Sequence, residues 1–145
     1  MDNTRTNWLA VVASAIAGVL VGTLWYALLF NKQWMAGNGI TMNEAQDKMF
    51  KNGVEIPMDT SPMIFNTIAM FAYAFLMNWL LQRANARTLA SGATVGAVVG
   101  AMSAIGVCIG NMFSMDSSSL SMVDGSYSFV IFTVMGAILG GWQKK

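Results

Sequence analysis

The chain has 145 residues, of which 55% are hydrophobic and only 10% are charged, and its formal net charge is +1. Soluble domains carry about a quarter charged residues, so this composition excludes an ordinary soluble domain, and the lack of a basic excess argues against a nucleic-acid partner. The length and uniformly apolar composition favour a single domain over residues 1–145. The chain has no histidine and one cysteine, Cys108, so we expect no metal, no cofactor and no intramolecular disulfide.

The first predicted membrane span covers residues 8–30, an apolar run long enough to cross a hydrocarbon core of about 30 Å. The run is longer than the apolar core of a secretory signal, so we expect an uncleaved helix. Ser14, Gly18 and Gly22 recur every four residues along it. Small residues at this spacing let membrane helices approach closely, so we interpret this face as a packing surface.

Residues 31–61 form the only extended polar region between the predicted spans. Thr41 and Glu44 have the spacing of a capping box, and Gly53 is a residue that commonly ends a helix. Glu44 is also followed four residues later by Lys48, which favours a helix. We therefore predict a short amphipathic helix at the membrane surface, acting as a linker or as a lid.

The second predicted span covers residues 63–82 and carries Asn66 and Tyr73, seven residues apart and so close to one face. A short turn joins it to the third predicted span, residues 90–114. Because helices joined by a short turn pack against each other, we expect these two spans to be antiparallel neighbours.

The third predicted span contains no charged residue, and small or polar residues recur along one of its faces. These residues are Gly92, Gly96, Gly100, Ser103 and Asn111. Such a face lets a neighbouring backbone approach closely. We therefore predict that this helix lies at the centre of the bundle.

The fourth predicted span covers residues 125–142 and contains another small pair, Gly136 and Gly140. Asp124 and Ser126 lie at its start, and either residue type is suited to an N-cap. The alternative is a functional carboxylate, because an acid held at membrane depth is costly and indicates an ion or proton path.

Several side chains form a candidate polar seam between helices, and they are Asn66, Tyr73, Ser103, Asn111 and Asp124. Hydrogen bonds between helices explain the same residues without a substrate. The chain also has 13 methionines, which allow copper(I) binding, although flexible packing is the simpler interpretation of their spacing. No nucleophile lies beside a base, so we expect no catalytic site and no enzyme activity.

Basic residues are unevenly divided between the two predicted sides of the membrane. The side that holds both termini has Arg5, Arg83, Arg87, Lys144 and Lys145, and the other side has Lys32, Lys48 and Lys51. Lysine and arginine in short loops concentrate on the cytoplasmic side. We therefore predict that both termini are cytoplasmic.

Short motifs at both ends of the chain resemble a known family. They are residues 7–10, 22–26 and 30–35 near the start, and residues 124–127 and 135–142 near the end. These motifs resemble an uncharacterised bacterial membrane family, the domain of unknown function 1761. The resemblance implies a small multi-pass protein of the bacterial inner membrane without an assigned activity.

We therefore expect an all-α integral membrane bundle of four transmembrane helices, with the short amphipathic helix between the first two. The chain has more small-residue faces than one bundle interior needs. Our leading hypothesis is a non-enzymatic component that contacts membrane lipids and either self-associates as a homo-oligomer or serves as an accessory subunit of a membrane complex. The alternative is a small-solute or ion transporter or channel that uses the polar seam.

Overall fold

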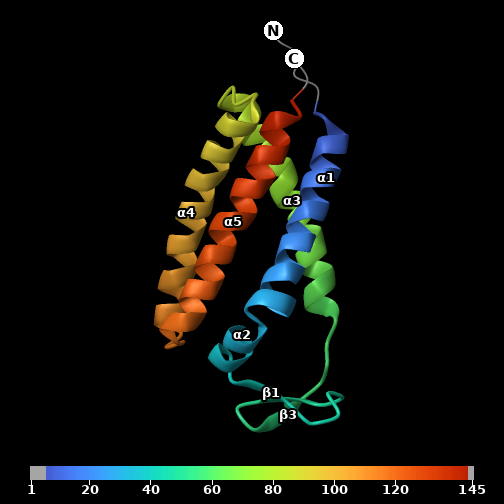
Figure 1. The fold of residues 1–145 in the computed structure, drawn as a ribbon, viewed down its shortest axis with the longest axis vertical. Coiled ribbons are helices and arrows are strands. Elements are labelled where there is room, and N and C mark those ends of the chain that lie inside the picture. The colour runs from blue at the N-terminus through green and yellow to red at the C-terminus, as the bar shows by residue number, and fades with distance from the viewer. Residues whose placement is uncertain (1–5, 144–145) are drawn as a thin grey trace.

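The computed structural model describes residues 6–143, and four long helical segments run up and down in it (Figure 1). The segments are α1 (Trp8–Thr23) with its continuation η1 (Leu24–Leu29), α3 (Ser61–Arg83), α4 (Leu89–Phe113) and α5 (Ser118–Gly141). Each segment is long and apolar enough to cross a membrane. The prediction of four such helices is therefore confirmed.

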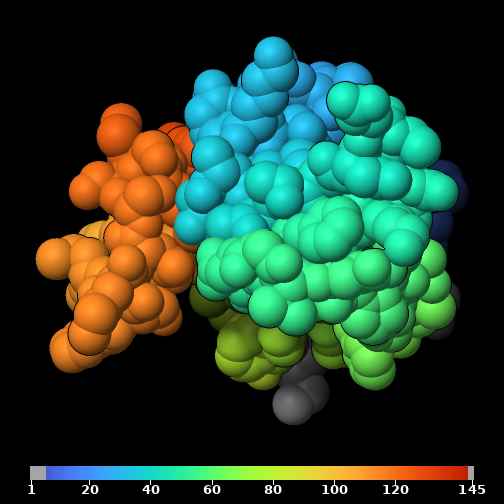
Figure 2. Space-filling view, turned by 90° about the horizontal axis from the view of Figure 1, so that it is seen from below, coloured from blue at the N-terminus to red at the C-terminus, as the bar shows by residue number. Residues whose placement is uncertain are grey.

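The region between the first two long segments does not form the predicted amphipathic helix. It contains the short helix α2 (Asn31–Gly37) and an antiparallel sheet of the strands β1 (Ile40–Met42), β2 (Met49–Lys51) and β3 (Val54–Ile56), in the order β1-β2-β3. Seen from below, α2 and the sheet cap one side of the bundle, and the turn between α4 and α5 projects beside them (Figure 2). The helix prediction for this region was wrong, and because of the sheet the fold is mostly helical but not all-α as expected.

Turn chemistry explains why strands form here. Asn52 and Gly53 both have positive φ, 51° and 83°, the conformation that a two-residue hairpin turn between β2 and β3 requires. In the turn after β1, the Asn43 side-chain oxygen accepts hydrogen bonds from the backbone of Asp47 and Lys48, at 3.1 and 3.0 Å. Thr41 therefore lies in a strand and not at a helix N-cap.

The charge pairing in this region also differs from the prediction. Lys48 lies 3.4 Å from a carboxylate oxygen of Glu55. Both side chains are more than half exposed, so this pair between the residue before β2 and a residue of β3 contributes little to stability. The helical pair of Glu44 with Lys48, which a helix would have formed, does not occur.

The start of α3 is set by local hydrogen bonds and a proline. Pro62 occupies the first turn of the helix, where its missing N–H costs nothing. Just before it, the backbone N–H and the hydroxyl of Ser61 both donate to Asp59. These bonds favour the charged carboxylate and lower the pKa of Asp59 below its ordinary value.

The central helix is α5 and not α4, so the predicted position of the third span was wrong. α5 contacts α1, α2, α3 and α4, whereas α4 packs along α5 and touches α3 only briefly. α4 accordingly lies at the edge of the bundle (Figure 1). The reason is that its glycine face is one-sided and accommodates one close neighbour, while its other faces carry bulky apolar side chains that remain exposed.

Close contact between α4 and α5 depends on glycines from both helices. A Cβ on Gly92 would overlap the carbonyl oxygen of Gly136, and a Cβ on Gly96 would overlap that of Phe132. At Gly100 a Cβ would lie 2.8 Å from the carbonyl oxygen of Phe129. The backbones of α4 and α5 therefore touch directly along this glycine-lined contact, which also includes Gly140.

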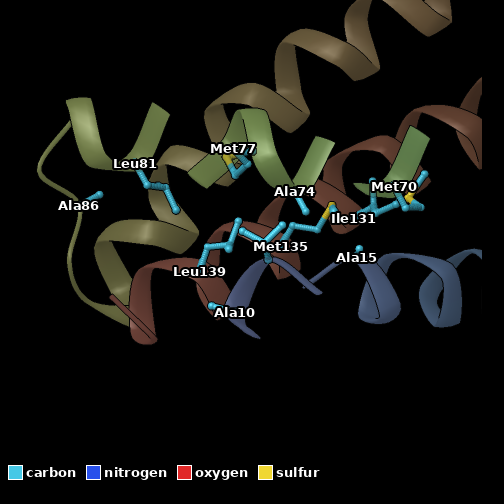
Figure 3. Packing of buried hydrophobic residues seen from close by; sticks show 11 residues of the cluster. Ala10, Ala15, Met70, Ala74, Met77, Leu81, Ala86, Ile131, Met135 and Leu139 are labelled. Atoms are coloured by element: carbon cyan, nitrogen blue, oxygen red, sulfur yellow. The ribbon is translucent and has the colours of Figure 1, made fainter. Parts of the chain in front are cut away.

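The main apolar core lies between α1, α3 and α5 (Figure 3). Small residues of α1 face mostly larger residues of the other two helices, and the labelled members are Ala10, Ala15, Met70, Ala74, Met77, Leu81, Ile131, Met135 and Leu139, together with Ala86 from the turn after α3. The small-residue face of α1 takes part in this packing. Ser14 is fully buried beside Met135, and a Cβ on Gly18 would lie 2.9 Å from the Met70 sulfur.

Candidate functional site

A polar cluster lies at the end of the bundle that carries α2 and the sheet, where η1, α4 and α5 meet. One carboxylate oxygen of Asp124 accepts a hydrogen bond from the Tyr26 hydroxyl at 2.9 Å, and the other accepts one from the Asn111 amide at 3.2 Å. The three side chains come from three different elements. Each carboxylate oxygen therefore has one neutral donor.

Asp124 lies inside α5 and does not cap it, so the N-cap prediction was wrong. The cap is Ser117, whose backbone is extended and whose hydroxyl oxygen accepts a bond from the Leu120 N–H at 3.3 Å. α5 then begins at Ser118, and Asp124 follows about 9 Å along the axis at 1.5 Å per residue. The carboxylate is thus held by a helix interior rather than by a loop.

The π-helical segment η1 positions two aromatic side chains that donate hydrogen bonds to consecutive residues of α5. The Trp25 indole N–H donates to the carbonyl of Val123 at 3.0 Å, beside the bond from Tyr26 to Asp124. Asn31 donates to the carbonyl of Tyr26 at 3.1 Å, which satisfies an acceptor at the end of this segment. Short π-helical turns inside α-helices are frequent at functional sites.

Aromatic rings surround the hydrogen bond between Tyr26 and Asp124. The Tyr26 ring meets Tyr127 edge-on with centroids 4.9 Å apart, and it meets Trp34 edge-on at 5.9 Å. Gly22 makes room for this arrangement, because a Cβ there would lie 3.2 Å from the Tyr127 hydroxyl. The cluster is therefore a carboxylate with neutral donors in an aromatic setting.

No cation neutralises Asp124 within residues 6–143, where Lys48 and Glu55 form the only ion pair. The same range contains no group of three or more residues arranged to hold a metal ion. Asp124 is half-buried, and withdrawing a carboxylate from water without a neighbouring cation is costly. Binding a proton or another cation is the chemistry that this cluster offers.

The structure brings together only two of the five predicted seam residues, Asn111 and Asp124. Asn66 is exposed on α3, and Tyr73 packs edge-on against Phe132 with centroids 5.2 Å apart. Ser103 is half-buried on α4, two turns before Asn111. A seam between the second and third spans does not form because α3 and α4 touch only briefly.

Tyr26 was not among the site residues predicted from the sequence, although it contacts Asp124. The signal that could have pointed to Tyr26 is its motif, because residues 22–26, 30–35 and 124–127 all resemble the family and all meet at this cluster. No curated protein and no solved structure matches the chain. A family model described as a protein of unknown function, DUF1761, matches residues 9–140. Since that match covers nearly the whole chain, this protein belongs to the DUF1761 family.

Proposed function

We propose that this protein is a multi-pass membrane carrier for a proton or another monovalent cation, with Asp124 as the ion-binding residue. One observation carries the proposal: Asp124 lies within an apolar helix and, in residues 6–143, is held only by the neutral donors Tyr26 and Asn111. A single carboxylate supplies one negative charge, which matches a monovalent ion. The proposal includes no catalytic step.

The proposed orientation places both termini in the cytoplasm. It is supported by Arg83 at the end of α3 and Arg87 in the short turn to α4, at the end of the bundle where α1 begins and α5 ends. Basic residues in short loops favour the cytoplasmic side. The Asp124 cluster then lies near the opposite face of the membrane.

A carrier is better supported than an open pore. Between Asp124 and the cytoplasmic end, α5 contributes Ile131, Met135 and Leu139 to the core, each at most 2% exposed. The buried hydroxyls beside this layer, those of Ser14 and Ser128, donate to backbone carbonyls, so the layer gives a continuous water path little polar lining. A carrier that exposes its site alternately to the two sides does not need one.

The test is ion flux in vesicles that contain the purified protein. We expect a proton or alkali-cation flux above that of empty vesicles, recorded with a pH-sensitive or a cation-sensitive dye. Asp124→Asn is expected to reduce it to the background of empty vesicles, because the amide keeps the shape but loses the charge. The matched control is Asp116→Asn, the same change at an exposed turn residue. Absence of proton and alkali-cation flux, or full flux in Asp124→Asn, would contradict the proposal.

The outer face of α4 supports a second proposal, self-association into a homo-oligomer. Gly106 and Gly110 lie four residues apart, and a Cβ on either would meet no described atom within 4 Å. On the same helix, Met102 and Ile105 are 69% and 62% exposed. Pairs of small residues at this spacing let two membrane helices pack closely, and here the chain itself provides no partner.

Disulfide crosslinking in membranes tests the self-association. In a Cys108→Ser background, Ile109→Cys on the outer face of α4 is expected to give a covalent dimer, and adding Gly106→Leu is expected to reduce its yield about tenfold or more, since a bulky residue separates the backbones. Ile68→Cys, exposed on α3, is the control position and should not crosslink. A monomer alone from Ile109→Cys would contradict the proposal.

A further inference from the structure

An apolar groove of about 250 Å³ lies between α3 and α4, with Phe132 of α5 between the two helices. It is lined by Tyr73, Leu76, Met77, Leu80, Val99 and Phe132. The groove exists because α3 and α4 both pack on α5 while touching each other only briefly.

The groove has the position that an acyl chain would need. Leu76 and Tyr73 are 58% and 41% exposed, so the groove is open sideways, toward the lipid in a membrane-inserted chain. At 1.5 Å per residue, Leu80 and Tyr73 lie about 5 and 15 Å from the end of α3 at Arg83. This range corresponds to one leaflet of a hydrocarbon core about 30 Å thick.

Positive charge lies at the end of the groove, near the expected level of the lipid headgroups. Arg83 ends α3 with its guanidinium carbon 5.4 Å from the centre of the Trp79 ring, and Arg87 lies in the turn to α4. Within residues 6–143 neither arginine has an acidic partner, because the one ion pair in that range is in the sheet. The arginines therefore complement an anionic headgroup that an acyl chain in the groove would place beside them.

We propose that this groove and these two arginines bind one anionic phospholipid, with an acyl chain along α3 and the phosphate at Arg83 and Arg87. Basic pockets between transmembrane helices on the cytoplasmic side are a known way of holding anionic headgroups. The proposal goes beyond the ion site. It shares with that proposal the insertion of the chain in a membrane and the cytoplasmic position of the turn between α3 and α4.

Native mass spectrometry of the detergent-solubilised protein tests the lipid site. Phosphatidylglycerol and phosphatidylcholine with identical acyl chains are added in equal amounts. We expect retention of phosphatidylglycerol to exceed that of phosphatidylcholine by about 25-fold, since each of the two arginines near the headgroup favours an anionic lipid by about fivefold. The Arg83→Gln/Arg87→Gln variant is expected to retain both lipids equally.

Two further variants separate the headgroup from the acyl chain. Val99→Trp fills the groove and is expected to reduce retention of phosphatidylglycerol, with circular dichroism showing that the helices persist. Lys48→Gln/Lys51→Gln removes the same charge from the sheet at the other end and should keep the preference. Equal retention of the two lipids by the wild type, a preference that survives loss of both arginines, or its loss in the lysine control would overturn the proposal.

Discussion

Gly96→Ala is expected to destabilise the fold by about 1–3 kcal/mol, whereas Gly106→Ala, ten residues along the same helix, is expected to be neutral or stabilising. A Cβ at Gly96 would overlap the backbone carbonyl oxygen of Phe132. Backbone cannot move aside as a flexible side-chain end can, so α4 and α5 must separate. At Gly106 a Cβ meets no described atom within 4 Å, and alanine favours the helix by up to about 1 kcal/mol relative to glycine.

The two variants form a matched pair because they make the same chemical change in the same helix. Reversible unfolding in mixed micelles, with detergent in sufficient excess to keep the protein monomeric so that the proposed contact through Gly106 is absent, measures the difference in their free energies of unfolding by circular dichroism. Gly92→Ala is expected to behave like Gly96→Ala, since its Cβ would overlap the carbonyl oxygen of Gly136. If Gly96→Ala proves as stable as Gly106→Ala, then α4 does not pack on α5 through its glycine face.

The long helices could be predicted from the sequence because each depends on one local property, an apolar run of sufficient length. Their bounds differ from the predicted ones by at most two residues except at α5, which begins at Ser118 and not at residue 125. The error has a physical cause. An aspartate before an apolar run is typical of an N-cap, but here Ser117 is the N-cap. The helix therefore already includes residues 118–124.

The sheet was predictable from the sequence but was not predicted. Asn-Gly between short apolar segments is the strongest short-range signal for a hairpin, and Asn52-Gly53 forms that turn. The capping-box spacing of Thr41 and Glu44 pointed to a helix instead. Two local signals conflicted, and the turn, which requires positive φ at both of its residues, was the more restrictive one.

The candidate site could not be predicted from the sequence alone. Tyr26 and Asp124 are 98 positions apart, and their contact depends on which helix is central. The glycine face of α4 indicated a close neighbour but not its identity. Because α4 packs on α5 and touches α3 only briefly, Asn111 of α4 contacts Asp124 of α5, whereas Asn66 and Tyr73 of α3 do not.

Tyr26→Phe is expected to destabilise the protein by about 1–3 kcal/mol, because one carboxylate oxygen of Asp124 loses its donor in an apolar setting. Tyr73→Phe removes the same hydroxyl from a ring that packs on Phe132 and has no hydrogen bond within residues 6–143. It is expected to change stability by less than about 0.5 kcal/mol. The free energy of unfolding in mixed micelles measures both changes.

A double-mutant cycle then attributes the effect to one hydrogen bond. In an Asp124→Leu background, Tyr26→Phe is expected to cost less than about 0.5 kcal/mol, since no acceptor remains, so the coupling energy should lie between about 0.5 and 3 kcal/mol. An equal cost of Tyr26→Phe in both backgrounds would mean that the hydroxyl acts elsewhere. Asp124→Asn keeps an acceptor oxygen for Tyr26 and removes only the charge. It should therefore stay folded while losing ion flux, which separates the role of Asp124 in stability from its role in binding an ion.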